Sequence, residues 1–157
     1  RVVICDPRAD VLDGFPIEGV EKICDMPDDV IRESAHDGHT AIVALTHDPR
    51  IDDMGLMEAL KTEAFYVGAM GSSKTSDSRR DRLRALDINA DELDRLRAPV
   101  GLPIGSKTPP EIALSILAEI TVTRKRLEAE ETASSNVEES SSQESESQLA
   151  SSGIGVG

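Results

Sequence analysis

The sequence predicts an α/β fold in which helices cover a parallel β-sheet. Short apolar runs without polar alternation, such as residues 2–5 and 40–46, are typical of strands buried on both faces. Each run is followed by a stretch with helical periodicity, and strands that alternate with helices favour a parallel sheet. Three of the runs also end in a polar or glycine-containing turn. In a parallel sheet such turns share one edge, where ligands bind.

The first half of the chain is predicted to hold three strands and two helices: strands at residues 2–5, 19–24 and 40–46, and helices over residues 28–37 and from residue 52 onward. The first strand ends in an Asp-Pro-Arg tripeptide, which makes Asp6 and Arg8 candidate ligand contacts. The third strand ends near His47, a candidate contact, although a single histidine at a strand end is more often structural. Asp52 and Asp53 are expected to begin the second helix.

Residues 65–74, FYVGAMGSSK, are the stretch around which the candidate site is organised. The apolar residues predict a buried strand, and Gly68 and Gly71 allow the backbone to bend or to be approached closely. Ser72 and Ser73 then offer hydroxyls to the first turn of a helix, whose first amides have no helical partner. These amides and the helix dipole favour an anion, and cationic side chains follow: Lys74, Arg79, Arg80, Arg82 and Arg84. An ordinary strand-to-helix turn before a solvated, arginine-rich helix explains the same residues.

The remaining part is predicted to contain a helix over residues 77–86, a short helix begun by Asn89, an edge strand at residues 100–104 and a helix over residues 109–127. The first helix is expected to turn Leu83 and Leu86 inward. Asn89 with Glu92, and Thr108 with Glu111, have the spacing of capping boxes. The last helix carries an apolar stripe that is expected to pack on the sheet: Ile112, Ala113, Ile116, Leu117 and Ile120.

The tail, residues 128–157, differs from the rest in composition, with seven Glu, no Lys or Arg, and a serine-rich run. Such a segment buries too little apolar surface to offset its ordering entropy, so it is predicted to be disordered. The folded domain is therefore expected to span residues 1–127. This domain keeps 23 acidic residues against all 17 Lys and Arg, which leaves a net charge of about −6 of the −13 for the whole chain.

An acidic, lysine-poor chain is typical of proteins kept soluble in concentrated salt, so a halophilic, haloarchaeal source is expected. The same charge argues against a nucleic-acid partner. No apolar run is long enough to span a bilayer and no signal peptide is recognisable, which predicts a cytoplasmic protein without a membrane partner. Cys5 and Cys24 lack the spacing of metal ligands, so no metal site is expected and both are predicted to be buried free thiols.

The chain contains four motifs in this order: DPR after the first strand, LTHD, YVGAMGSSKTSDSRRDRL, and APVGLPIGSKTPPEIALSILAEI. Together they resemble the C-terminal Rossmann domain of the XdhC/CoxI family, the xanthine dehydrogenase accessory proteins. The resemblance covers residues 1 to about 126. It implies a Rossmann-like fold and a chaperone-like maturation factor, without catalytic residues of its own, which binds molybdenum cofactor and delivers it to the apo-enzyme of a molybdenum hydroxylase.

The same resemblance implies that the candidate ligand contacts bind the cofactor: Asp6, Arg8, His47, Gly68, Gly71, Ser72, Ser73 and Lys74. Molybdopterin carries a phosphate, so the predicted anion-binding turn suits it. The partners that the resemblance implies are the apo-enzyme of a molybdenum hydroxylase and a cysteine desulfurase. The alternative is an NAD(P)-dependent oxidoreductase or a nucleotide-binding domain, with Asp6 on a ribose and Arg8 on a 2′-phosphate.

The sequence departs from the family in two ways. It lacks the N-terminal domain of the family, and it begins where the second Rossmann strand begins, without the first strand and its G-x-G-x-x-G turn. In the usual strand order 3-2-1-4-5 the missing strand is the central one. A gap is therefore expected between the strands at residues 2–5 and 40–46. Either the chain is an N-terminally truncated fragment, which is favoured, or another polypeptide fills the gap, including a second copy in a homo-oligomer, or the two strands close directly on each other. The missing glycine-rich turn also weighs against the oxidoreductase alternative.

Overall fold

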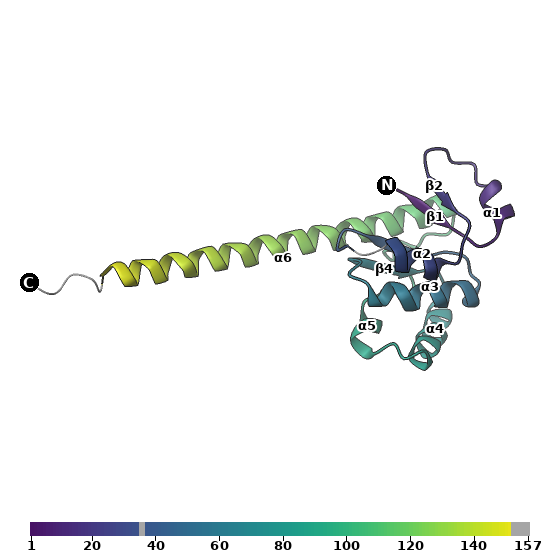
Figure 1. Cartoon of the computed structure of the whole chain (residues 1–157). Helices are drawn as coiled ribbons and strands as arrows, with labels where there is room; N and C mark the ends of the chain where they lie inside the picture. The colour runs from purple at the N-terminus through teal and green to yellow at the C-terminus, as the bar shows by residue number, and fades with distance from the viewer. Residues whose placement is uncertain (35–36, 152–157) are drawn as a thin grey trace, which may run out of the picture. The chain divides into compact units, whose positions relative to one another are not determined.

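The computed structural model describes residues 1–34 and 37–151 of the 157, with side chains described as far as residue 134. The chain divides into two units, residues 1–120 and 121–157, which are considered separately. The first unit holds all the strands and the beginning of the long helix α6 (Pro109–Ser151). Figure 1 shows the order of the elements along the chain.

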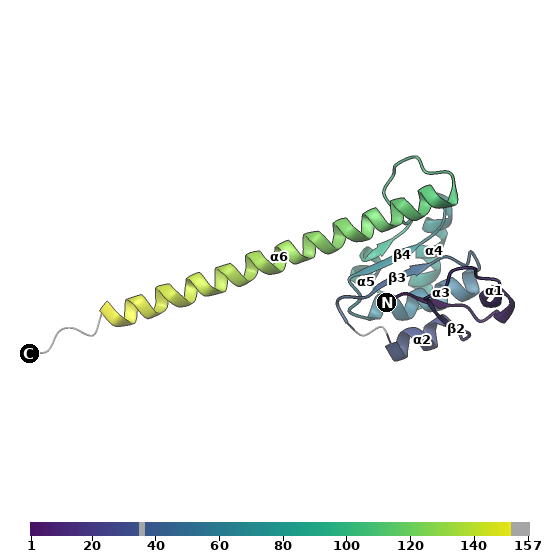
Figure 2. The same cartoon turned by 90° about the horizontal axis from the view of Figure 1, so that it is seen from above.

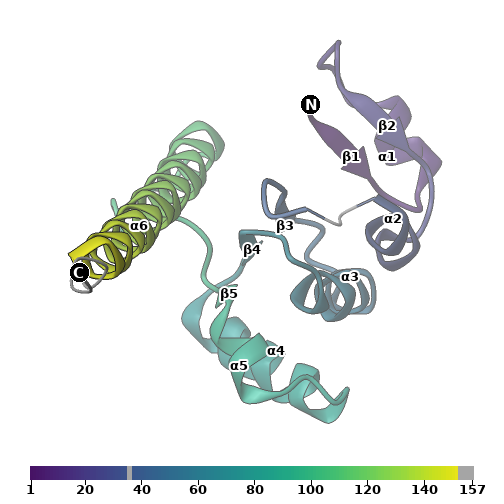
Figure 3. The ribbon, with the colours of Figure 1, turned by 60° about the vertical axis from the view of Figure 1, so that its left-hand side comes forward.

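Among its described residues, the first unit contains five short strands, all paired in parallel: β1 (Val3–Cys5), β2 (Glu21–Ile23), β3 (Ala41–Ala44), β4 (Tyr66–Ala69) and β5 (Leu96–Arg97). Strand β1 pairs with β2, and β3, β4 and β5 form a separate three-stranded sheet in that order. Figure 3 shows the two groups of strands side by side in the ribbon. The α/β class and the parallel pairing that the sequence predicts are confirmed.

The two sheets do not join through β1 and β3 in the part of the chain that the structure describes. Strand β1 is paired only on its β2 side, and β3 only on its β4 side. Hydrophobic side chains nearby are exposed, with Val3 at 40% and Leu45 at 49% of their full accessible area. This order, β2-β1 beside β3-β4-β5, matches the arrangement predicted for a Rossmann-like sheet without its central strand.

The other helices of the first unit cover the strands: α1 (Ala9–Asp13), α2 (Pro27–Ser34), α3 (Pro49–Lys61), α4 (Ser73–Ala85) and α5 (Ala90–Asp94). Helix α3 packs on β3 and β4, and α2, α4 and α5 contact α3 (Figure 2). Gly55 allows the close approach of α2 to α3, because a Cβ there would lie 3.0 Å from Cβ of Pro27. The capping box predicted for α5 is present, since Asn89 and Glu92 each accept a hydrogen bond from the other's backbone amide.

The hydrophobic core lies between α3, β4 and the segment from α4 to β5. Its members are almost fully buried: Leu56, Ala59, Leu60, Ala64, Val67, Ala69, Leu83, Ile88, Leu93 and Leu96. Burial of one Leu or Val side chain is worth about 1.5–3 kcal/mol. This core therefore holds β4 and the start of α4 in place, and the candidate site depends on both.

Two predicted helix starts are wrong. Helix α3 begins at Pro49 rather than at Asp52, because Asp48 is its N-cap and accepts the amide of Arg50 at 2.9 Å. Proline at the first position fits, since no helical hydrogen bond is lost there. Helix α4 begins at Ser73, four residues before the helix predicted over residues 77–86, although the first turn predicted at Ser72 and Ser73 is confirmed.

The strand predicted at residues 100–104 is absent, and β5 lies earlier in the chain. The amide of Val100 still donates to the carbonyl of Ala69 at 3.1 Å, so this segment runs along the end of β4 without forming a strand. Gly101 then adopts a φ of +95°, and Ser115 packs so closely that a Cβ at Gly101 would lie 2.5 Å from its Oγ. The left-handed turn ends the extended segment.

Three inward positions predicted for the helices are also wrong, because Ala113, Leu86 and Leu117 are exposed, the last two at 40% and 62%. Leu83 and Ile116 are buried as predicted. Glu111 accepts the amides of Lys107 and Thr108, both at 2.9 Å, which confirms its capping role at the start of α6. The expected burial of the thiols is wrong too. Cys5 is half-buried and Cys24 exposed, and both are free.

Helix α6 continues past residue 127 to Ser151. Along its described part the side chains form surface ion pairs, among them Lys125 with Glu128 and Arg126 with Glu130. The domain boundary at residue 127 and the disorder expected for the tail stay predictions. None of the helices in the described residues is long and apolar enough to cross a membrane.

Candidate functional site

The turn between β4 and α4 presents free backbone amides at the start of a helix. Ser72 is the N-cap of α4, and its Oγ accepts the amide of Thr75 at 3.2 Å. Its carbonyl accepts both the amide and the hydroxyl of Ser76 at 2.9 Å. The amides of Ser73 and Lys74 have no partner among the described residues and lie at first-turn positions, where helical geometry supplies none. The turn can therefore donate two hydrogen bonds to a ligand.

Charge favours an anion at this turn. Helix α4 has 13 residues, so its N-terminus carries a partial positive charge from the aligned peptide dipoles. Lys74 is exposed, and no hydrogen bond or ion pair of its ammonium occurs within the described residues. Ser72 and Ser73 are exposed as well, so the donors can be reached from solvent. The prediction of an anion-binding turn is consistent with this geometry.

The arginines of α4 do not supply the charge that the sequence analysis assigned to them. Arg79 is 1% exposed and paired with Asp52 and Asp53, and Arg82 also pairs with Asp53. Arg80 donates to the carbonyls of Leu93 and Leu96 at 2.8 and 2.9 Å, and Arg84 pairs with Asp81. The helix is not a uniformly solvated basic surface, because Arg79, Arg80 and Arg82 bind partners within the fold, whereas Arg84 is exposed and pairs with Asp81 on the surface.

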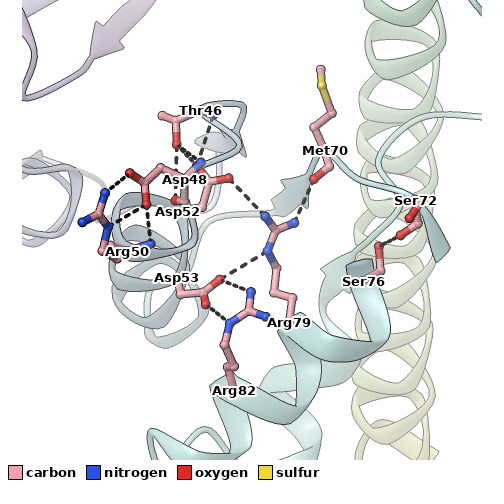
Figure 4. A network of polar contacts seen from close by, with 10 residues as sticks. All are labelled: Thr46, Asp48, Arg50, Asp52, Asp53, Met70, Ser72, Ser76, Arg79 and Arg82. Atoms are coloured by element: carbon pink, nitrogen blue, oxygen red, sulfur yellow. Dashed lines mark hydrogen bonds and ion pairs between the residues drawn. The ribbon is translucent and has the colours of Figure 1, made fainter. Parts of the chain in front are cut away.

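A buried ionic network lies behind the turn (Figure 4). Arg79 donates to the carbonyl of Met70 at 2.9 Å, to Asp52 at 3.1 Å and to Asp53 at 3.3 Å. Both carboxylates are buried, at 3% and 6% exposure. Two positive and two negative charges meet here, counting Arg82, so the burial of each ion is compensated by a partner.

The loop between β3 and α3 is held by the same network. Oδ1 of Asp52 accepts the hydroxyl of Thr46 at 2.7 Å and the amide of Thr46 at 3.2 Å. Oγ1 of Thr46 in turn accepts the amide of Asp48 at 3.1 Å. His47 lies between these two fixed residues, is exposed, and has a φ of +63°. A left-handed conformation costs a non-glycine residue about 1–2 kcal/mol, so the network overrides the local preference of His47.

An Asp-Pro-Arg turn occurs twice, after β1 and after β3. In the first, Asp6 accepts the amide of Arg8 at 2.9 Å and its guanidinium at 2.8 and 2.7 Å. In the second, Asp48 accepts the amide of Arg50 at 2.9 Å and its guanidinium at 3.1 and 2.9 Å. The repeated tripeptide was visible in the sequence, but only the first copy was recognised there. Arg50 is therefore a candidate contact that the sequence analysis missed.

The two turns are neighbours. The hydrogen bond from Arg8 lowers the pKa of Asp6, and the bonds from Arg50 lower the pKa of Asp48 to about 2. The pKa of Arg8 is raised by its hydrogen bond to Asp6 first, and also by the charge of Asp48. The charge at the end of β3 therefore acts on the arginine that follows β1.

Asp6 is poorly placed for the ribose contact of the oxidoreductase alternative. It is 5% exposed, and its two oxygens already accept three hydrogen bonds from Arg8. Gly68 has a structural explanation instead of a ligand contact. It lies in buried β4, and a Cβ there would be 2.6 Å from Cγ2 of Val100 and 2.9 Å from Cε1 of Tyr66. Gly71 does lie in the turn, where a Cβ would be 3.3 Å from Cβ of Thr75.

The residues that the sequence analysis selected as candidate contacts thus lie at the carboxyl ends of three parallel strands. The exception is Gly68, which lies inside β4. No group of three or more His, Cys, Asp or Glu side chains suited to a metal ion occurs among the residues described. Parallel strands that alternate with helices and carry polar side chains at their carboxyl ends define a Rossmann-like class of domain.

The family model described as the XdhC Rossmann domain matches residues 1–120, and the chain belongs to this family. Two curated relatives are similar to it. The molybdenum cofactor insertion chaperone PaoD of Escherichia coli (strain K12) is 35% identical over 88 residues, which is 56% of this chain. A probable xanthine dehydrogenase subunit from Bacillus subtilis (strain 168) is 31% identical over 102 residues, or 65% of this chain.

A solved structure has the same fold. The crystal structure of a xanthine dehydrogenase from Bacillus halodurans matches 79% of this chain with a TM-score of 0.63 and 29% sequence identity. This chain spans 28% and 29% of the lengths of the two curated relatives and 35% of the solved chain. The Rossmann-like fold is therefore shown, and the relatives' names describe much longer proteins.

Proposed function

We propose that this chain is an accessory factor of molybdenum hydroxylases, which binds molybdenum cofactor as cargo and delivers it to the apo-enzyme. The cofactor's phosphate would bind at the turn between β4 and α4. Such a role consists of binding and release, so it needs a site for the cargo and a surface for the receiving enzyme. It does not need a bond-breaking group on this chain.

The observation that carries the proposal is the pair of unpartnered amides at Ser73 and Lys74 beside the Lys74 ammonium. A phosphate ester presents several oxygens and a double negative charge, and it can accept both amides while lying near the lysine. The family membership and the name of the relative PaoD support molybdenum cofactor as the phosphate-bearing ligand. The name of the relative from Bacillus subtilis supports a xanthine dehydrogenase as the recipient.

The test is a titration with inorganic phosphate and with a pterin phosphate, followed by backbone amide chemical shifts. The amides of Ser73 and Lys74 are expected to move most, and the pterin phosphate is expected to bind more tightly than phosphate. Saturating shifts elsewhere, with these two amides unmoved, would place the site somewhere else on the protein.

Substitution of Ser73 by proline removes one donor without removing the helix. Proline is favoured at the first helical position, and Ser72 already has the extended backbone, φ −79° and ψ 167°, that a residue before proline prefers. Ser73→Pro is expected to weaken phosphate binding by about tenfold, since a charge-assisted hydrogen bond contributes roughly 1.5–3 kcal/mol. Lys74→Ala is expected to weaken it too, whereas Lys61→Ala, an exposed lysine at the end of α3, serves as the matched control.

Delivery is tested with a cofactor-free molybdenum hydroxylase. The cofactor-loaded chain is expected to restore its activity, and the Ser73→Pro chain to restore less at equal concentration. Equal reactivation by free cofactor would mean that the chain does not deliver it. A cysteine desulfurase, as a second proposed partner, can be tested by co-purification with the same two chains.

A further inference from the structure

We infer that Asp52 and Arg79 are positioning residues that make the β4–α4 turn and the His47 loop a single binding surface. The binding of an anion at Ser73 and Lys74 therefore changes the environment of the His47 amide, and the change passes through contacts within the protein rather than through solvent. This inference rests on the proposed function of the turn. Beyond that function, it assigns Asp52 and Arg79 as the residues that fix the geometry of the turn, and the His47 loop as the segment that responds together with the turn.

The first link joins α4 to the backbone at the end of β4. Arg79 reaches back from α4 and donates to the carbonyl of Met70 at 2.9 Å. Met70 directly precedes Gly71 and the N-cap Ser72, so this bond fixes the backbone from which the free amides project. Arg79 is 1% exposed, and a buried guanidinium has no water to replace a lost partner.

The second link joins the same guanidinium to the neighbouring loop. Arg79 donates to Oδ2 of Asp52 at 3.1 Å, and Oδ1 of Asp52 accepts the hydroxyl of Thr46 at 2.7 Å. Through Oγ1 of Thr46 the chain of bonds reaches the amide of Asp48. Every bond in this path is close to ideal length, and Figure 4 shows the side chains converging between α3, α4 and the two strand ends.

The path is stiff because its central ion pair, Arg79 with Asp52, is buried and charged, and the bonds on either side of this pair are part-buried. A close-packed interior does not deform smoothly, and a buried ion cannot give up its partner without a large penalty. The backbone at Gly71 therefore cannot shift on ligand binding without moving Met70, Arg79 and Asp52 together. His47, held at φ +63° between Thr46 and Asp48, is where that movement reaches the surface.

Neighbouring acids of α3 provide a matched pair of variants. Asp52 contacts Arg79 and Thr46, whereas the hydrogen bonds of Asp53 within the described residues go to Arg79 and Arg82 and to neither loop. Asp52→Asn and Asp53→Asn each remove one buried negative charge from the same network. A general structural role would make the two variants behave alike.

The experiment is a titration with inorganic phosphate, followed by amide chemical shifts in the wild-type chain and both variants. In the wild type, Ser73, Lys74 and His47 are expected to respond with one dissociation constant. Asp52→Asn is expected to weaken binding about fivefold or more and to remove the His47 response, which is the size of an ordinary coupling between sites. Asp53→Asn is expected to keep the phosphate dissociation constant and the size of the His47 response within about twofold of the wild type. Equal effects of the two variants, or an unmoved His47 while Ser73 and Lys74 respond in the wild type, would overturn the inference and leave the proposed function standing.

Thr46→Val covers the case in which Asp52→Asn does not fold. It removes the hydroxyl that links Asp52 to Asp48 but keeps the side-chain shape. It is expected to remove the His47 response and to leave phosphate bound at Ser73 and Lys74. If phosphate binds at neither amide in any variant, the proposed function fails. The coupling between the two loops is then measured in the ligand-free protein, where Thr46→Val is expected to shift the amide resonance of Gly71. An unshifted Gly71 resonance would overturn the inference.

Discussion

The hydroxyl of Tyr66 in β4 donates a 2.6 Å hydrogen bond to Oε2 of Glu119 in α6. The same oxygen accepts the amide of Gly101 at 2.7 Å. One carboxylate thus joins a central strand, the turn after β5 and the beginning of the last helix of the first unit. Burial raises the pKa of Tyr66, and the hydrogen bond to Glu119 and the charge of Glu119 raise it further.

Tyr66 is the single tyrosine of the chain, so its ionisation can be followed directly by absorbance. Because its folded pKa is raised, the stability it contributes is present below the ordinary tyrosine pKa of about 10 and is lost as pH rises above that value. Tyrosinate is expected to appear only together with alkaline unfolding. Glu119→Gln is expected to lower the pKa of Tyr66, and a wild-type titration near pH 10 in the folded state would contradict the buried contact.

The ion pair of Asp48 with Arg50 gives a prediction at acid pH. The pKa of Asp48 is held at about 2 by the hydrogen bonds from Arg50, so its contribution to stability is present above the unfolded value near 3.9 and is lost as pH falls towards 2. Arg50→Ala is expected to raise this pKa, as measured by carboxyl carbon shifts, and to leave the pKa of Asp6 lowered. A rise at Asp6 of equal size would show that Arg50 acts on both turns.

The separate sheets predict a difference in hydrogen exchange. Strand β4 is paired on both sides, whereas β3 is paired only with β4 and β1 only with β2. The amides on the free edges of β1 and β3 are expected to exchange faster than those of β4 in the monomer. Self-association through these edges, seen as concentration-dependent mass in sedimentation, is expected to slow them. Protection of β3 equal to that of β4 in the monomer would show that the gap is closed.

Removal of residues 130–157 is expected to leave the melting temperature of the first unit almost unchanged. No residue whose side chain the structure describes in the deleted part belongs to the hydrophobic core, and the Ser/Glu composition of this part cannot bury much apolar surface. Differential scanning calorimetry of the two chains is the measurement, with deletion from residue 113 onward as a control that removes Ile116 and Glu119 and is expected to destabilise strongly. A drop of several degrees from the shorter deletion would mean that the tail packs on the domain.

Molar salt is expected to raise the melting temperature. The first 127 residues carry a net charge of about −6, and the repulsion between these charges is screened as the Debye length falls to about 3 Å at 1 M. The variant with Glu33→Gln and Glu63→Gln, which neutralises two exposed acids, is expected to depend less on potassium chloride. Equal melting temperatures in dilute and molar salt would contradict the proposed halophilic adaptation.

The sequence predicted most of what local signals encode. The apolar runs located β1 to β4 but not β5, and the pair Asn89 and Glu92 located a capped helix, because both signals depend on neighbours within a few residues. The free amides of Ser73 and Lys74 were predictable for the same reason. The lack of pairing between β1 and β3 among the described residues was expected from the resemblance to the family.

Contacts between distant residues could not be predicted. Arg79 looked like one of four solvated arginines, and only the fold brings it to Asp52 and Asp53, which lie 27 and 26 residues earlier. The same fold turns those two acids inward, although they read as the start of a helix. Gly68 was assigned to ligand binding because a glycine near a turn often makes room for a ligand, but here the room is taken by Val100 and Tyr66.

That occupied space at Gly68 restricts how the domain can diversify. Even alanine would place a carbon 2.6 Å from the half-buried side chain of Val100 and 2.9 Å from the buried ring of Tyr66, so every variant at this position has to displace a neighbour. Under mutation and selection, β4 is thus expected to stay invariant at Gly68, whereas the exposed positions of the turn, Ser73 and Lys74, are free to vary. New ligand preferences would then arise by replacing side chains of the turn, on a strand whose backbone path is inherited unchanged.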